Sequence, residues 1–142
     1  MSKPSIVIDF DGTLVTNAWP QIGEWQPGAV NALQELTKHA HVIINTCRIA
    51  PMQPDGKTWR PPAHVHFEIN RIREMLDDQQ LYTVEIWTKA WKPPGVAYVD
   101  DRAVRYAGRK GSWKALTPML INKCAGYEEA AASLEFSEEV HG

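Results

Sequence analysis

The sequence lacks the features that are typical of membrane proteins, secreted proteins and general nucleic-acid-binding proteins. No apolar run approaches the roughly 20 residues that a helix needs to cross a bilayer, and the opening M-S-K-P-S lacks the basic and apolar regions of a signal peptide. Two cysteines are too few for a disulfide framework. A net charge of -2 gives no sign of general affinity for nucleic acid, although it does not exclude binding through a local basic patch. We therefore expect a cytoplasmic protein with reduced thiols and no membrane partner.

What is present fits one globular domain. The chain has 142 residues, of which 44% are hydrophobic and 23% charged, values typical of a soluble protein with a single core. It has no internal repeat, domain-sized linker or low-complexity segment. We therefore predict one domain that spans residues 1–142.

The most informative segment is residues 6–14, which read I-V-I-D-F-D-G-T-L. Residues 5–8 have the length and β-branching of a buried parallel strand, so Asp9 and Asp11 fall at its carboxyl end, where open α/β sheets place their chemistry. Alternate residues of an extended segment point the same way, and Gly12 lets the chain turn. Two carboxylates this close repel unless a cation or a shared proton intervenes. The competing interpretation is an ordinary strand followed by an Asp-Gly turn.

Strands and helices alternate along the chain, which predicts an α/β fold with a doubly wound parallel sheet and helices on both faces. The expected strands are 5–8, 42–45, 83–87 and 96–99. The expected helices are 27–38, 62–78, a short one at 103–107, one that starts at Thr117, and a terminal one at 128–139. A start at Thr117 avoids enclosing Pro118 in a helix.

Three motifs follow one another in a recognisable order: D-F-D-G-T-L, then N-T-C-R, then K-P-P-G-V-A-Y-V-D-D-R-A. Together they resemble the haloacid dehalogenase superfamily of phosphotransferases over residues 6–106. The resemblance implies a Rossmann-like sheet, and segments 15–26 and 50–63 are too short for a cap domain, as in minimal-cap members. A second candidate lysine, Lys89, and the proline-rich 50–63 segment depart from the family pattern.

Two carboxylates at this spacing suit covalent phosphoryl transfer. An aspartate can attack phosphorus to form an aspartyl-phosphate, which splits one difficult hydrolysis into two easier displacements. A second carboxylate can protonate the leaving alcohol and later take a proton from water. We assign these roles to Asp9 and Asp11, and the resemblance agrees. The predicted activity is hydrolysis of small phosphomonoesters.

A carboxylate that attacks a phosphate needs nearby positive charge. Mg²⁺ suits a few carboxylates, waters and a phosphate oxygen. By resemblance, the ligands are Asp9, the backbone carbonyl of Asp11 and Asp100. Asp101 either binds the metal directly or holds a metal-bound water or Lys92. An isolated Asp-Asp pair would be interpreted as a solvated turn.

The remaining site residues follow from their order in the chain. Thr46 is expected to hydrogen-bond a phosphoryl oxygen, and a lysine to neutralise the nucleophile and the transferred group. Lys92 matches the K-P pattern of the family, and Lys89 is the alternative. Arg48 either contacts the leaving group or pairs with acidic neighbours, and ion pairing is expected for Arg102.

Six tryptophans all follow predicted strands toward the edge where the site is expected. They could form an aromatic rim that packs on the leaving group, with Trp19 and Trp25 as substrate contacts. The alternative is that they pack in irregular loops or at an oligomer interface. Loop packing or an interface is the favoured explanation. The lack of a cap leaves room for large substrates or a homo-oligomer.

Two smaller features receive structural interpretations. His64 and His66 could bind metal in an extended segment, but surface histidines at a helix start are more common. Cys47 lies beside Thr46, and we expect a buried, inert thiol there.

Other functions remain open at this stage. A receiver-like module also places aspartates, a threonine and a lysine at strand ends, and it takes up a phosphoryl group without turnover. A scaffold that only binds a partner is a second option. Among enzymes, the alternative is a phosphatase that acts on nucleic-acid ends through Arg48, Lys57, Arg60 and Arg109, which the acidic balance disfavours.

Overall fold

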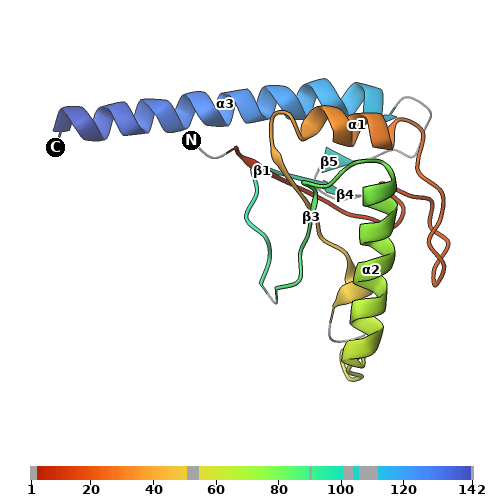
Figure 1. Ribbon diagram of the computed structural model, residues 1–142. Coiled ribbons are helices and arrows are strands. Elements are labelled where there is room, and N and C mark those ends of the chain that lie inside the picture. Colours follow the sequence, from red (N-terminus) through yellow and green to blue (C-terminus); the bar gives the residue numbers. More distant parts are fainter. Residues whose placement is uncertain (1–2, 51–54, 90, 101–103, 106–111, 142) are drawn as a thin grey trace.

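The computed structural model describes residues 3–50, 55–89, 91–100, 104–105 and 112–141, of which 104–105 and 127–141 are described as backbone only. It contains a five-stranded sheet in which all neighbouring strands run parallel (Figure 1). The strand order is β3-β2-β1-β4-β5, which places β1 at the centre. The strands are β1 (Ser5–Ile8), β2 (His41–Ile44), β3 (Glu85–Ile86), β4 (Ala97–Asp100) and β5 (Val104–Arg105).

Among the described residues, two α-helices and a short 3₁₀ helix lie between strands, and a third α-helix follows β5. They are α1 (Ala29–Leu36), η1 (Cys47–Ile49), α2 (Pro62–Asp78) and α3 (Ser112–His141). α1 starts after Gly28, whose φ of 81° favours glycine, and α2 starts at Pro62, where the missing N–H is not needed. α1 and α3 lie side by side (Figure 1).

The main core lies on one face of the sheet. Ile6 and Ile8 of β1 pack there with Leu33 of α1, Leu76 of α2 and Leu120 of α3. All three α-helices therefore contribute to the same face.

A second cluster on the opposite face contains Val7, Ile43, Trp87 and the half-buried Tyr98. The loop between β3 and β4 covers this face so closely that a Cβ at Gly95 would lie 2.9 Å from Cγ2 of Val7. The predicted α/β fold with a parallel, Rossmann-like sheet is confirmed. The predicted doubly wound arrangement is not, because the described residues place a loop on this face and no helix.

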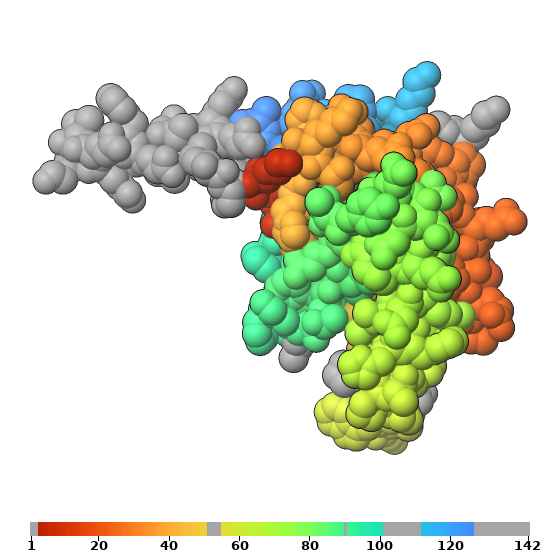
Figure 2. Space-filling view, in the orientation of Figure 1, coloured from red at the N-terminus to blue at the C-terminus, as the bar shows by residue number. Residues whose placement is uncertain are grey.

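A hairpin of residues 14–26 follows the first strand. Val15 and Trp25 form an antiparallel bridge, and the Thr16 N–H donates to the Glu24 carbonyl over 2.8 Å. Figure 2 shows α2 as a ridge with this hairpin on one side and the segment around β3 on the other. The hairpin is therefore placed to reach α2 from the end of β1.

The C-terminal half departs from two predictions. The short helix expected at 103–107 is wrong, because Val104–Arg105 forms β5. The expected helix start at Thr117 and the separate helix at 128–139 are also wrong, because α3 is continuous from Ser112 and contains Pro118. Trp113 is fully buried and its indole N–H donates to the Thr13 carbonyl over 3.2 Å. This anchor holds the turn before Pro118, and the proline removes only one helical hydrogen bond.

None of the helices among the described residues combines the length and the apolar character that a membrane span requires.

Candidate functional site

The ends of three neighbouring strands bring predicted site residues to one edge of the sheet. Ile8 pairs with Ile44 of β2 and Val99 of β4. The Asp9 N–H donates to the Val99 carbonyl over 3.0 Å, and the Asn45 N–H donates to the Ile8 carbonyl over 3.0 Å. Asp9 and Asp100 thus follow paired positions on adjacent strands, and Thr46 follows β2 beside them, as the sequence predicts.

Asp9 and Asp100 lie at the ends of neighbouring strands. By alternation along the strands, Asp9 falls on the face of Val7 and Asp100 on that of Tyr98, which is the same face of the sheet. Neighbouring strands lie about 4.8 Å apart, and Mg²⁺ commonly takes only one or two carboxylates besides water and phosphate. Within the part of the chain that the structure describes, no group of three His, Cys, Asp or Glu side chains could hold a metal ion. Asp101 lies outside the described residues.

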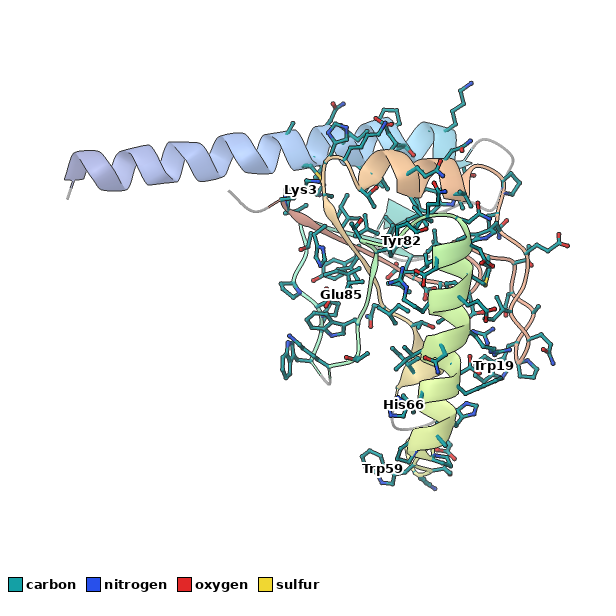
Figure 3. The ribbon with its side chains drawn as sticks, viewed as in Figure 1. Lys3, Trp19, Trp59, His66, Tyr82 and Glu85 are labelled. Atoms are coloured by element: carbon teal, nitrogen blue, oxygen red, sulfur yellow. The ribbon has the colours of Figure 1, made fainter. Side chains whose placement is uncertain are left out.

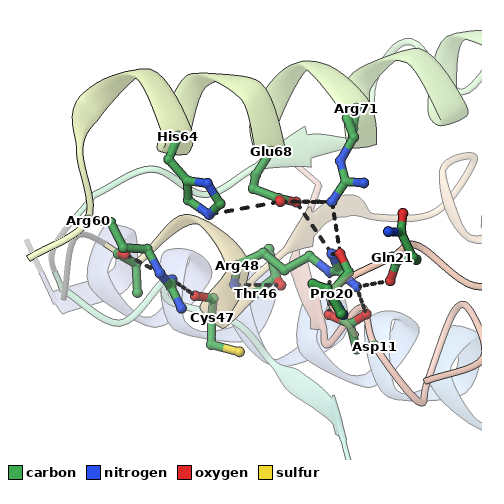
Figure 4. Close-up of polar contacts among 11 residues, drawn as sticks. Asp11, Pro20, Gln21, Thr46, Cys47, Arg48, Arg60, His64, Glu68 and Arg71 are labelled. Atoms are coloured by element: carbon green, nitrogen blue, oxygen red, sulfur yellow. Dashed lines mark hydrogen bonds and ion pairs between the residues drawn. The ribbon is translucent and has the colours of Figure 1, made fainter. Parts of the chain in front are cut away.

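Asp11, the predicted acid and base, makes a bidentate ion pair with Arg48 (Figure 4). Arg48 Nε donates to Asp11 Oδ2 over 2.7 Å and Nη2 donates to Oδ1 over 2.6 Å. Both oxygens of this carboxylate act as acceptors toward the guanidinium. Asp11 therefore has no proton to give while this pair is intact.

Arg48 is fully buried and is held by a second carboxylate from α2. Its Nη1 lies 3.4 Å from Glu68 Oε2, and Glu68 also accepts from Arg71 Nη2 over 2.8 Å. Burial alone would lower the pKa of the Arg48 guanidinium, but the hydrogen bonds and charges of Asp11 and then Glu68 raise the pKa above its ordinary value. Asp11, Arg48, Glu68 and Arg71 form what we call the paired cluster.

The tip of the hairpin is tied to the same arginine. Arg48 Nη1 donates to the Pro20 carbonyl over 3.1 Å and Nη2 to the Gln21 carbonyl over 2.6 Å. With the bonds to Asp11 and Glu68, these contacts use all five N–H donors of the guanidinium. Of the two predicted roles for Arg48, ion pairing is the one that the structure shows. The substrate-binding role is withdrawn, because no donor remains for a leaving group.

Thr46 lies at the start of η1 and is largely buried. Its hydroxyl oxygen accepts the backbone N–H of Arg48 over 3.2 Å. This bond uses the oxygen as an acceptor and leaves the hydroxyl hydrogen to donate. Thr46 can therefore donate to a phosphoryl oxygen, the role predicted for it.

Both candidate lysines line one cavity of about 380 Å³ beside Thr46. We call it the lysine cavity. Among the described residues, no acidic side chain lines it, and the lining residues are Asn45, Thr46, Ile49, Ala50, Trp87, Thr88, Lys89, Trp91 and Lys92. The structure brings Lys89 and Lys92 to the same place, so geometry does not choose between them as the catalytic lysine.

The tryptophans divide into buried and exposed residues. Trp25 packs against the main core, so its predicted contact with substrate is not supported, and Trp87 and Trp113 are buried. Trp19 is 51% exposed and its ring stacks 4.8 Å from the Arg48 guanidinium carbon. Trp59 is also exposed and lies at the N-terminal end of α2 (Figure 3). Packing in or against the two core clusters thus accounts for three of the six tryptophans.

Two further side chains differ from expectation or were missed. Cys47 is exposed, which corrects the prediction of a buried thiol, because the turn of η1 directs Arg48 inward in its place. Glu68 is 3% exposed and was not identified from the sequence. Its signal was a carboxylate four residues before Ile72, on the apolar stripe of α2. His64 and His66 lie exposed on this helix, as expected.

Comparison with known proteins establishes the fold. No family model and no curated protein sequence matches the chain. A solved structure of a conserved protein from Bacteroides thetaiotaomicron matches with a TM-score of 0.59 and 21% sequence identity. The match covers 86% of this chain and 93% of that one. At this identity the likeness shows a shared α/β fold and nothing about activity.

Proposed function

We propose that the chain is a Mg²⁺-dependent phosphomonoester hydrolase that transfers the phosphoryl group to Asp9. The observation that carries this proposal is the juxtaposition at the carboxyl edge of the sheet. Asp9 follows β1 and Asp100 ends the paired strand β4, and Thr46 lines a cavity to which the described residues contribute two lysines and no acidic side chain. Carboxylates for a metal and a nucleophile beside donors for an anion are what phosphoryl transfer requires.

Each residue has a definite part in the proposed reaction. The Asp9 carboxylate attacks phosphorus, and the bond from phosphorus to the leaving oxygen breaks with its electron pair going to that oxygen. Thr46 donates its hydroxyl hydrogen to a non-bridging oxygen, and Lys92 offsets the charge of the transferred group. Bound Mg²⁺ would supply further positive charge between Asp9, Asp100 and the phosphate. Water then cleaves the acyl-phosphate bond and regenerates Asp9.

The Asp11–Arg48 pair restricts which leaving groups depart. A departing alkoxide needs a proton, and Asp11 has none to give while both its oxygens accept from Arg48. Aryl leaving groups depart as stable anions and need no proton. We therefore expect aryl phosphates to react faster than alkyl phosphates unless the pair opens during turnover.

The same pair favours a second candidate, a phosphoacceptor module without turnover. If Asp11 stays bound to Arg48, it is not released to activate water, and a phosphoryl group would remain on Asp9. Hydrolysis of nucleic-acid ends has less support. Arg48 and Arg60 are buried and bonded within the chain, and Arg109 lies outside the described residues.

The test is hydrolysis of p-nitrophenyl phosphate with Mg²⁺ and with a chelator. We expect activity that the chelator abolishes, and Asp9→Asn should retain less than about a tenth of it because an amide is not a nucleophile. Asp78→Asn, an exposed change on α2, is the matched control and should leave the rate unchanged. Full activity in chelator, or an active Asp9→Asn variant, would overturn the proposal. One equivalent of nitrophenol released without turnover would indicate the phosphoacceptor module.

A further inference from the structure

The basic side chains near the site differ in whether their charge is paired. Arg48 and Arg71 face the Glu68 carboxylate, and Arg48 also faces Asp11. Among the described residues, no carboxylate lies within ion-pairing distance of Lys89 or Lys92. The positive charge that remains to meet a ligand is therefore in the lysine cavity.

Aromatic side chains hold both ammonium groups in place. Lys89 Nζ lies 5.0 Å from the centre of the Trp87 ring and 5.4 Å from that of Trp91. The two rings meet edge to face, and the Trp87 indole N–H donates to the Trp91 carbonyl over 2.6 Å. Lys92 Nζ lies 4.2 Å from the centre of the Tyr98 ring. Aromatic rings orient a cation without neutralising it, so both lysines keep a full charge for a ligand.

The cavity holds more charge and space than one phosphoryl group uses. In the proposed reaction a single lysine, Lys92, offsets the transferred group, which leaves Lys89 without an anion. A volume of about 380 Å³ corresponds to roughly twelve water volumes. Two like charges in one cavity also repel, and a second anion would relieve that repulsion.

We propose that the lysine cavity binds a second anionic group of the substrate, with Lys89 as its main contact. The substrate class is then phosphomonoesters that carry another carboxylate or phosphate group. This inference rests on the proposed function for the catalytic step, but anion binding in the cavity can be measured without turnover.

Binding is tested by calorimetry of the full chain with inorganic phosphate and inorganic pyrophosphate, without added metal. We expect pyrophosphate to bind at least tenfold more tightly, and Lys89→Gln to remove most of that difference. Lys123→Gln removes the same charge from an exposed position on α3 and should keep the difference. Equal affinity for the two anions, or a difference that Lys89→Gln leaves intact, would overturn the proposal.

Kinetics supply the second measurement. Glycerol 3-phosphate and 3-phosphoglycerate differ by a carboxylate in place of a hydroxymethyl group. We expect the ratio of their kcat/KM values to favour 3-phosphoglycerate, and to fall about tenfold in Lys89→Gln but not in Lys123→Gln. A ratio that Lys89→Gln does not change would contradict the inference. If p-nitrophenyl phosphate is not hydrolysed while pyrophosphate still binds through Lys89, the proposed hydrolase fails and the anion site stands.

Discussion

Two regions flank the carboxyl edge of the sheet, and they use positive charge differently. In the paired cluster, each guanidinium is bonded to a carboxylate, and Arg48 and Glu68 are almost wholly buried. In the lysine cavity, two exposed ammonium groups face aromatic rings and no acidic side chain of the residues that the structure describes. Paired and buried charges hold parts of the chain together, whereas unpaired charges are available to a ligand. We therefore expect the first region to stabilise the fold and the second to bind a ligand.

The largest effect on stability is expected from removing Arg48, which tests whether the paired cluster holds the fold together. In Arg48→Met, Glu68 and Asp11 lose a guanidinium that neutralises them, and Pro20 and Gln21 at the hairpin tip lose a donor. Removing one partner of a buried ion pair costs about 3–5 kcal/mol. Urea unfolding should show a loss of this size.

An exposed pair gives the matched control for that experiment. Lys38 lies 3.0 Å from Glu35 on the surface, so Lys38→Met should leave the free energy of unfolding unchanged within error. If Arg48→Met were equally harmless, the paired cluster would have no structural role.

A smaller effect is expected from the other side of the paired cluster. Glu68→Gln removes the charge that faces Arg48 and Arg71 but keeps the size of the side chain. Hydrogen bonds to charged groups contribute about 1.5–3 kcal/mol, and we expect a loss in this range by urea unfolding. Glu74→Gln, an exposed change on the same helix, should have no effect. Equal stability of the two variants would show that Glu68 does not hold Arg48.

The smallest change in stability is expected in the lysine cavity. Lys89→Gln loses its cation–π contacts with Trp87 and Trp91, and Lys92→Gln loses the one with Tyr98. Each such contact contributes about 0.5–1 kcal/mol at exposed positions. Unfolding in urea should shift by no more than this, while the affinity for pyrophosphate falls at least tenfold. A loss of stability as large as that of Arg48→Met would mean that these lysines are structural after all.

Four of the five described strands could be predicted from the sequence because each lies in a short apolar run that ends on a polar group, whereas β5 lies where a short helix was expected. β1 was predicted with its observed bounds, and so was α2, whose apolar stripe and initial proline are local signals. The position of Asp9, Asp100 and Thr46 at one edge of the sheet could be predicted because each lies at the carboxyl end of a predicted parallel strand. The doubly wound arrangement could not be predicted, since no local signal shows that a loop, described over residues 87–89 and 91–96, replaces a helix.

Pairing between distant side chains could not be predicted in the same way. Arg48 was identified as a site residue, but the choice between substrate and Asp11 depends on a contact across 37 positions of the chain. Pro118 is a reliable local signal against a helix, and the burial of Trp113 overrides it. Trp19 and Trp25 occupy the same predicted loop, and the sequence does not show that Trp25 packs against the core while Trp19 is exposed. In each case tertiary contacts outweigh local preference.

Phosphorylation of Asp9 is the most direct test of the proposed chemistry. The full chain would be mixed with p-nitrophenyl phosphate and Mg²⁺, quenched in acid, and examined by intact-mass and peptide mass spectrometry. We expect a single phosphoryl group on the peptide that contains Asp9, and none in Asp9→Asn. Hydrolysis that proceeds equally well in Asp9→Asn, or a phosphoryl group carried elsewhere, would contradict the account.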